Sequence, residues 1–401
     1  MKKILVFFLA GMIFVFLVRE KAIIGSEKSL AKSDLQTEIL NSKAEEATHL
    51  SKWHPSSTPF PQNRKAWEWP FDSKSIWNLP LPSNAVYQPA NLKSGVATSA
   101  ELELLYQTSE QDPLTRIYAP GSWTHRCDGT KSPTGNPAAE IYIHFPRNII
   151  IPDADPPSTP NNSAAILQPD GKTIASIASG ARCEPGGPLY GWYGGKQSIY
   201  GAGTYGTSGG SGLSTLGGTI RLGELTNDLP IRHALRVNVW ASKYLYFNPK
   251  DPKPGYRWPA TVADNYAVYR YGGTNPNLEM GTLLAIPPKI KPEDLGLKSI
   301  PALKLFYALQ NYGAYVADDT AWNVTAFSIQ QNAPEEFEQV YGYKYETNNL
   351  KSQWFKEYYA LVESLHIVVN NSPTTNTIDE KRLVTLAPPL IYEENNTDNY
   401  E

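Results

Sequence analysis

The sequence predicts an α+β fold dominated by β-structure: an antiparallel sheet, or a sandwich-like or jelly-roll-like body, with two or three C-terminal helices. Segments that alternate apolar and polar residues lie mainly between residues 115 and 288, whereas helical spacing dominates after residue 300. Glycine (29) and proline (33) are too common for a helical bundle, and charged residues (19%) are too rare for a disordered chain.

The first 18 residues predict either a cleaved signal peptide or an uncleaved N-terminal anchor. Lys2 and Lys3 precede an apolar run over residues 4–18, which is shorter than the roughly 20 residues that span a bilayer comfortably. Both interpretations place the rest of the chain outside the cytoplasm, secreted or tethered at the outer face of the cytoplasmic membrane. The predicted parts are the signal or anchor (1–18), a polar tether (19–65), one β-rich domain (66–390) and a flexible tail (391–401).

The elements of the domain are predicted in order. Residues 67–82 are rich in aromatic residues and proline, so we expect an irregular segment that wraps the body and buries its rings. Residues 98–107 predict a short helix from their Ala, Glu and Leu content. The predicted strands are 140–146, a hairpin over 164–178 around Pro169-Asp170-Gly171, and then 219–225, 234–247 and 281–288.

The C-terminal part has helical periodicity. Ile300–Val316 predicts one helix with Gly313 as its C-terminal cap, and Lys351–Leu365 predicts another. His366–Val369 predicts a last strand.

Cys127 and Cys183 are the only cysteines of the sequence, so an exported chain would join them in a disulfide. A metal or catalytic thiol is the alternative, which their lack of CxxC spacing disfavours.

The glycine-rich stretch from Tyr190 to Leu225 is the most unusual segment. It matches neither the P-loop nor the dinucleotide-binding fingerprint. One interpretation is a tightly turned surface loop. The other is a groove in which Trp192, Tyr193 and Tyr205 offer flat apolar faces to sugar rings. Trp258, in an aromatic loop that also contains Asp264, predicts a second sugar-binding edge.

Acidic and basic residues near strand ends are the candidates for catalysis. Glu224 follows one predicted strand, and Arg232 and His233 precede the next, a pattern that suits acid/base chemistry or an ordinary surface ion pair. Asp319 follows Asp318 directly, and we expect adjacent side chains to diverge, so that at most one serves a given site. A cation site and the N-cap of the next element are the alternatives for that pair.

Two other chemistries are less favoured. The sequence GTSGGSG contains Ser208 and Ser211, which a serine hydrolase would have to pair with a base and a carboxylate. His125 and His144 lack the spacing of metal ligands, so we predict no metal and no cofactor. The net charge of −3 gives no basic excess for nucleic acid.

The motifs GGSGLSTLGGTIRLGEL, PIRHAL and ALQNYGAYVADD, with FDSKSIWNLPLP upstream, resemble those of a group of uncharacterised secreted bacterial proteins. The resemblance covers most of residues 67–390 and implies one exported globular domain, with no catalytic residues to carry over. Members of that group tend to have histidine near the Gly-Gly-Ser-Gly core, where this chain has Thr207 and Ser208.

The sequence therefore predicts an exported carbohydrate-active enzyme, either a glycoside hydrolase or a polysaccharide lyase. A hydrolase would pair Glu224 with Asp319 or Asp264. A lyase would use Tyr205 or His233 as base, with Arg232 neutralising a uronate. The alternatives are a non-catalytic glycan-binding or cell-envelope protein and a secreted serine hydrolase. The expected partner is a polysaccharide or glycan.

Overall fold

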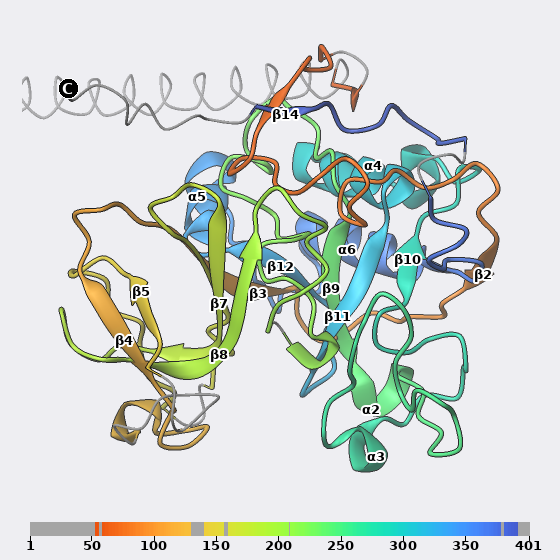
Figure 1. The fold of residues 1–401 in the computed structure, drawn as a ribbon. Helices are drawn as coiled ribbons and strands as arrows, with labels where there is room; N and C mark the ends of the chain where they lie inside the picture. The colour runs from red at the N-terminus through yellow and green to blue at the C-terminus, as the bar shows by residue number, and fades with distance from the viewer. Residues whose placement is uncertain are drawn as a thin grey trace, which may run out of the picture. The chain divides into compact units, whose positions relative to one another are not determined.

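A mixed sheet runs through the computed structural model, which describes residues 53–55, 58–129, 140–155, 159–207, 209–377 and 381–391 (Figure 1). Among these residues the sheet has twelve strands in the order β2-β13-β10-β11-β9-β12-β3-β6-β7-β8-β4-β5. Three helices lie in the C-terminal part, so the β-dominated α+β class is confirmed. The described residues from Pro55 onward form one compact unit. The predicted signal or anchor and the predicted tether up to residue 52 lie outside the described residues.

The first seven strands of the sheet bring together distant parts of the chain. They are β2 (Tyr87–Pro89), β13 (His366–Val368), β10 (Leu283–Ala285), β11 (Ala314–Thr320), β9 (Leu235–Trp240), β12 (Ala326–Gln330) and β3 (Ser99–Gln107). The other five are β6 (Ala164–Leu167), β7 (Thr173–Ala181), β8 (Leu189–Ser198), β4 (Leu114–Tyr118) and β5 (Tyr142–His144). A separate parallel pair joins β1 (Arg64–Lys65) to β14 (Leu390–Ile391).

The sheet is mixed rather than antiparallel, which corrects that part of the prediction. The pairs β9–β11, β3–β12, β3–β6 and β4–β8 are parallel. Parallel neighbours need long crossover connections, and the chain supplies them as extended loops and helices between the paired strands. No helix among the described residues is long and apolar enough to cross a membrane.

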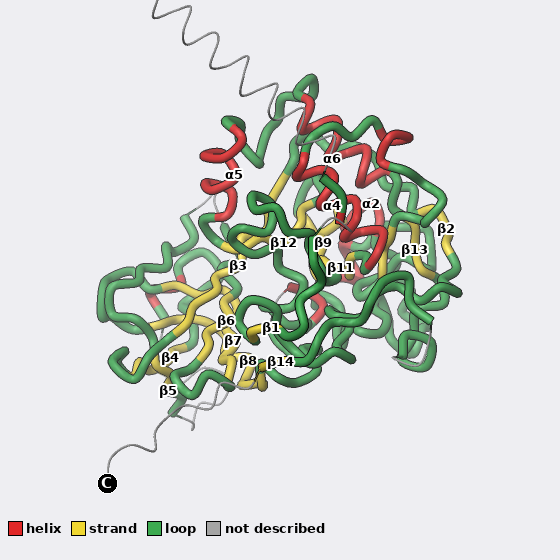
Figure 2. Tube along the Cα trace, turned by 90° about the horizontal axis from the view of Figure 1, so that it is seen from above, coloured by secondary structure: helices red, strands yellow, loops and turns green. Residues whose placement is uncertain are grey.

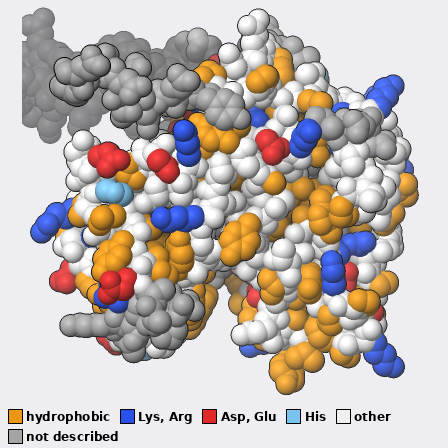
Figure 3. Space-filling view, in the orientation of Figure 1, with side chains coloured by type: hydrophobic (Ala, Val, Ile, Leu, Met, Phe, Trp, Pro, Cys, Tyr) orange, Lys and Arg blue, Asp and Glu red, His pale blue; other side chains and the backbone are white. Residues whose placement is uncertain are grey.

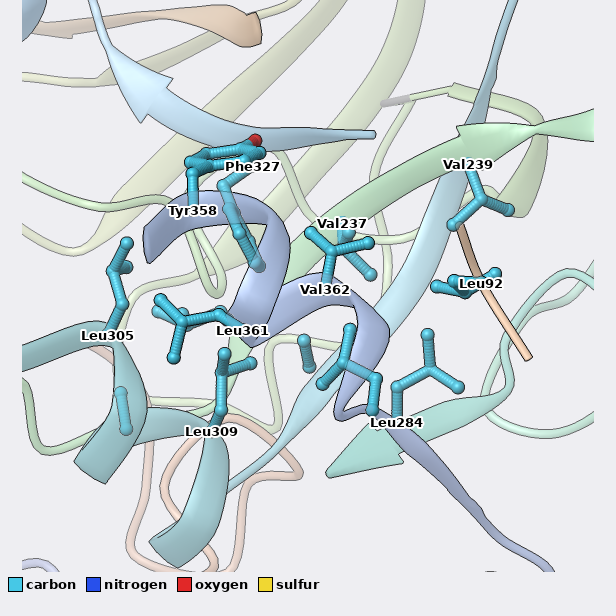
Figure 4. Close-up of a cluster of buried hydrophobic side chains, with 14 of the residues drawn as sticks. Leu92, Val237, Val239, Leu284, Leu305, Leu309, Phe327, Tyr358, Leu361 and Val362 are labelled. Atoms are coloured by element: carbon cyan, nitrogen blue, oxygen red, sulfur yellow. The ribbon is translucent and has the colours of Figure 1, made fainter. Parts of the chain in front are cut away.

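The longer helices cover the half of the sheet around β9 and β11. α4 (Ile300–Asn311) and α6 (Gln353–Glu363) lie side by side there (Figure 2), and α5 (Ala333–Tyr341) packs near β12. Figure 4 shows leucines of α4 and α6 meeting Val237 of β9 and Leu284 of β10. The shorter helices are α2 (Ala241–Tyr244) and α3 (Ala267–Arg270), with 3-10 turns η2 (Arg126–Asp128), η3 (Gly209–Ser211) and η4 (Pro292–Leu295).

Several local predictions are confirmed. β6 and β7 form the hairpin around Pro169-Asp170-Gly171. β5, β10, β13 and α6 lie within their predicted ranges. Residues 67–82 form an irregular segment that buries Phe71 and Trp77.

Other predictions are wrong in instructive ways. Residues 99–107 form β3 rather than a helix, because β12 and β6 flank them on both sides with parallel pairing. Residues 219–225 are mostly turns, and the strand predicted over 234–247 ends at Trp240, where α2 begins. The helix predicted to Val316 ends at Asn311, since Gly313 adopts φ 79° and the chain turns into β11.

Candidate functional site

Four acidic side chains meet near the carboxyl end of β11, and we call them the acidic cluster: Glu101, Asp264, Asp318 and Asp319. Asp318 and Asp319 belong to β11, Glu101 to β3, and Asp264 to the loop before α3. One carboxylate oxygen from each of the three aspartates lies within 4.8 Å of the other two. Three segments that are far apart in sequence therefore supply one concentrated group of carboxylates.

Strand register and amide side chains hold this cluster together. Asn238 of β9 pairs with Asp318 across the parallel ladder, and its Nδ2 donates to Glu101 Oε2 at 3.4 Å. Asn161 Nδ2 donates to Asp318 Oδ2 at 3.1 Å. A bulge between Val316 and Asp318 interrupts the regular pairing there. The expectation that Asp318 and Asp319 diverge is therefore wrong, since both reach the cluster.

Two glycines of η3 lie directly against the carboxylates. A Cβ atom at Gly209 would come within 2.4 Å of Asp318 Cγ, and one at Gly210 within 2.3 Å of Asp264 Oδ2. The backbone N–H of Gly210 donates to Asp318 Oδ1 at 2.9 Å. Glycine is required here because only its bare backbone leaves room for the carboxylates.

Two tyrosine hydroxyl groups donate hydrogen bonds to Asp319 and Asp264. Tyr266 donates its hydroxyl proton to Asp319 Oδ1 at 2.8 Å, and Tyr271 donates to Asp264 Oδ2 at 2.7 Å. Burial and the neighbouring carboxylates raise the pKa of both phenols. Both tyrosines therefore act as hydrogen-bond donors at neutral pH and orient the carboxylates they contact.

Burial and mutual repulsion keep protons in the cluster. Burial, together with the nearby Asp264, raises the pKa of Asp319 to about 6, and burial beside Glu103 raises that of Glu101 to about 8. Asp318 has a pKa well above the usual range for the same reasons, and burial also raises the pKa of Asp264. Raised carboxyl pKa values in a cleft are typical of groups that deliver protons.

One exposed aromatic residue contacts the acidic cluster, and two others lie near Asp319 or η3 in sequence. Tyr266 itself is exposed, and Trp322 lies three residues beyond Asp319 in the loop after β11. Tyr205 lies on the other side of η3 in sequence, with its ring 3.4 Å from where a Cβ of Gly195 would sit. Figure 3 shows a hollow at the lower edge of the molecule between the part containing β4 and β8 and the part containing α2 and α3. The carboxyl ends of β9 and β11 point toward it in Figure 1.

Glu224 and His233 form a pair that the structure does not bring to the acidic cluster. His233 precedes β9, whereas Asp319 is in register with Val239 near its end, and six strand residues rise about 20 Å. The sequence predicts that Glu224 pairs with Asp319 or Asp264, and this prediction is wrong because these carboxylates lie too far apart. Parallel alignment of β9 and β11 places these groups at opposite ends of the same two strands.

The contacts of this pair are those of a buried structural link. His233 Nε2 lies 3.1 Å from Glu224 Oε1, and its Nδ1 lies 2.8 Å from the carbonyl oxygen of Ala234. Lys304 Nζ donates to the carbonyl oxygen of Glu224 at 2.7 Å. Burial opposes both charges, but the mutual contact raises the pKa of His233 and lowers the pKa of Glu224.

The remaining predicted residues are placed as follows. Arg232 Nη2 donates to Thr58 Oγ1 at 2.9 Å, and its guanidinium lies over the ring of Phe60. Trp192 and Tyr205 are exposed, whereas Tyr193 and Trp258 are half-buried and pack against apolar clusters.

The structure also bears on the cysteine and serine predictions. Cys127 and Cys183 form the predicted disulfide. Ser211 is buried, and its Oγ accepts from the amide of Leu213. Ser208 lies outside the described residues.

Sequence reasoning missed Glu101, Asn161 and Trp322, and it considered Asp318 only together with Asp319, expecting at most one of the two to serve a site. Glu101 sits on a strand that was predicted to be a helix, so its strand neighbours could not be anticipated. Asp264, Asp318 and Asp319 offer hard oxygen donors that could hold a divalent cation such as Ca²⁺. The one sequence signal that could have pointed to Trp322 is its position three residues after Asp319.

Comparison of the chain with protein-family models, curated proteins and solved structures gives no match.

Proposed function

We propose that this protein is an exported glycoside hydrolase and that the acidic cluster is its catalytic centre. One observation carries the proposal: three aspartates each place a carboxylate oxygen within 4.8 Å of the others, with raised pKa values, beside the exposed ring of Tyr266. Carboxylic acids that hold a proton near neutral pH next to ionised partners are what glycosidic bond cleavage uses.

Asp319 is the proposed general acid. It is partly exposed, its pKa is about 6, and Tyr266 orients one of its oxygens. Asp264 is the proposed nucleophile, because the short distance between the two carboxylates resembles the roughly 5–5.5 Å of retaining enzymes. Asp264 would attack the anomeric carbon as the bond to the leaving oxygen breaks and Asp319 gives that oxygen its proton. Water, deprotonated by Asp319, would then cleave the glycosyl ester.

A lyase is less well supported than a hydrolase. The lyase assigned from sequence relied on His233 or Tyr205 as base and on Arg232 to neutralise a uronate. Both ring nitrogens of His233 have partners, and Arg232 holds the N-terminal segment through Thr58. These contacts leave neither side chain available at the acidic cluster.

A panel of soluble polysaccharides tests the proposal, with reducing ends assayed for hydrolysis and ultraviolet absorbance of unsaturated products for elimination. We expect reducing ends without unsaturation, and a roughly 10²–10⁴-fold loss of rate in Asp319→Asn. Asp155→Asn, an exposed aspartate outside the cluster, is the matched control. The rate should fall as the pH rises through about 6, because Asp319 must be protonated.

Two results would contradict this assignment. Unsaturated products would indicate a lyase. Glycan binding without any product, by a correctly folded protein, would indicate a binding module, the alternative that the exposed aromatic residues also support.

A further inference from the structure

Two exposed tryptophans form a stacked pair on the part of the molecule that contains β4 and β8. The ring centroids of Trp123 and Trp192 are 6.5 Å apart, with 18° between their planes. Their side chains are 43% and 45% exposed. Large apolar rings left in water side by side usually mark a binding surface rather than a packing residue.

The loop that carries Trp123 is held rigidly from beneath. The guanidinium of Arg126 lies 4.9 Å from the Trp123 ring centroid, and its Nη2 donates to the carbonyl oxygen of Pro160 at 2.6 Å. The carboxylate of Asp153 accepts from the amides of Arg126 and Cys127, each at 2.9 Å. The disulfide then fastens Cys127 to Cys183 in the connection between β7 and β8.

This bracing presents an exposed indole in one fixed orientation. A binding platform gains affinity from such rigidity because little side-chain freedom is lost when a ligand stacks on it.

The chemistry around the pair favours a neutral sugar chain. Ser122, Thr124 and His125 place hydroxyl and imidazole groups next to the Trp123 ring in the chain, and Ser122 and His125 are exposed. Arg126 keeps its positive charge buried, while Asp128 is exposed on the same turn. Flat apolar faces with a polar rim suit pyranose rings, and the exposed carboxylate would repel an anionic chain.

The chain relates the stacked pair to the acidic cluster through β8 and η3. Trp192 and Gly195 lie three residues apart on β8, a rise of about 10 Å, and Gly195 packs against the ring of Tyr205. Four residues beyond Tyr205, Gly209 contacts Asp318. The exposed rings of Trp192 and Tyr205 therefore belong to the stretch of chain that leads from the stacked pair to the proposed catalytic centre.

We propose that Trp123 and Trp192 form a distal subsite that binds a neutral glycan chain several sugar units away from the acidic cluster. The subsite favours long chains over short oligosaccharides. Its place in a cleavage reaction rests on the proposed function, but its affinity for glycan does not.

The test uses the full chain with Trp123→Ala and Trp192→Ala, and Tyr142→Ala as control, since Tyr142 is an exposed aromatic residue on neighbouring β5. Affinity electrophoresis with soluble neutral glucan, xylan and mannan measures binding. We expect each tryptophan variant to bind the polymer that the parent prefers at least tenfold more weakly than the parent does. Tyr142→Ala should bind that polymer as tightly as the parent. Trp123→Phe, which keeps a flat ring, should retain most of the affinity, and near-ultraviolet circular dichroism checks the fold.

Kinetics separate this inference from the proposed function. If the protein cleaves glycans, both alanine variants should raise KM for the polymer by a larger factor than KM for short oligosaccharides. Normal binding and KM in both variants would overturn the subsite while the hydrolase stands. Weakened binding in a protein that cleaves nothing would overturn the hydrolase while the subsite stands. Tryptophan-dependent binding only to polyuronate, or only to phosphatidylcholine–phosphatidylglycerol vesicles, would also overturn the neutral-glycan subsite.

Discussion

Glu101 and Glu103 lie two residues apart on one face of β3, and we expect the same substitution to have opposite effects at the two positions. Glu101 lies near other carboxylates, and burial beside Glu103 raises its pKa from 4.5 to about 8. Glu103 Oε1 lies 3.1 Å from Nη1 of Arg236, and both side chains are fully buried. Replacing Glu101 by glutamine removes the cost of keeping a proton on this carboxyl group, whereas replacing Glu103 removes the partner of a buried cation.

The size of the Glu101 effect follows from proton linkage. Below pH 4.5 this residue is protonated in both the folded and the unfolded chain, so Glu101→Gln changes little. Between pH 4.5 and 8 the folded state keeps a proton that the unfolded state releases, and the free energy of unfolding falls by about 1.4 kcal/mol per pH unit. At pH 7 the accumulated loss approaches about 3 kcal/mol, which Glu101→Gln should recover in large part.

Urea unfolding of the parent, Glu101→Gln and Glu103→Gln across this pH range measures how each substitution changes the free energy of unfolding. Glu103→Gln should lose about 3–5 kcal/mol, because breaking a buried ion pair leaves Arg236 uncompensated. The reasoning is refuted if Glu101→Gln is less stable than the parent at pH 8, or if both proteins lose stability with pH at the same rate. Either result would mean that Glu101 is ionised in the folded state and compensated by a cation.

Three further outcomes follow from other contacts. Replacing Cys127 and Cys183 by serine should cost roughly 4 kcal/mol in denaturant unfolding, because the bond closes a loop with a sequence separation of 56. The pair of His233 and Glu224 should stabilise the fold fully between about pH 4.5 and 6.5. Its effect should be lost as the pH rises through the raised pKa of His233 or falls through the lowered pKa of Glu224, and Glu224→Gln should flatten both parts of a melting-temperature profile. Gly210→Ala should lower glycan turnover at least tenfold, because the new Cβ would lie 2.3 Å from Asp264 Oδ2 and would push this carboxylate away. Unchanged turnover would show that the acidic cluster works with the Asp264 carboxylate displaced.

Sequence periodicity predicted the correct secondary structure for those elements whose own residues determine their conformation. The hairpin around Asp170 follows from local turn chemistry, and α6 follows from apolar residues at helical spacing. Residues 99–107 were misassigned because Ala, Glu and Leu favour a helix, whereas pairing with β12 and β6 determines the outcome. Those neighbours come from residues 326–330 and 164–167, which no local pattern connects to β3.

The candidate site was predictable only in part for the same reason. Asp264 and Asp319 could be chosen as acidic residues near aromatic segments, and the structure brings them together. Glu224 was a reasonable choice from its position near a predicted strand end, but strand direction decides which ends meet. Asp318 reaches the cluster where a bulge interrupts the strand, and bulges leave no clear signal in a single sequence.

The glycine-rich segment 190–225 has two different packing roles along its length. At Gly217 a Cβ would lie 2.2 Å from the indole nitrogen of Trp77, so this glycine makes room for the N-terminal segment that wraps the domain. At Gly210 the neighbour is Asp264 of the acidic cluster. Substitutions near Gly217 should therefore reduce stability first, and those near Gly210 should reduce catalysis first. The unusual composition of the segment reflects a structural requirement at one end and a chemical one at the other, rather than a single groove along its whole length.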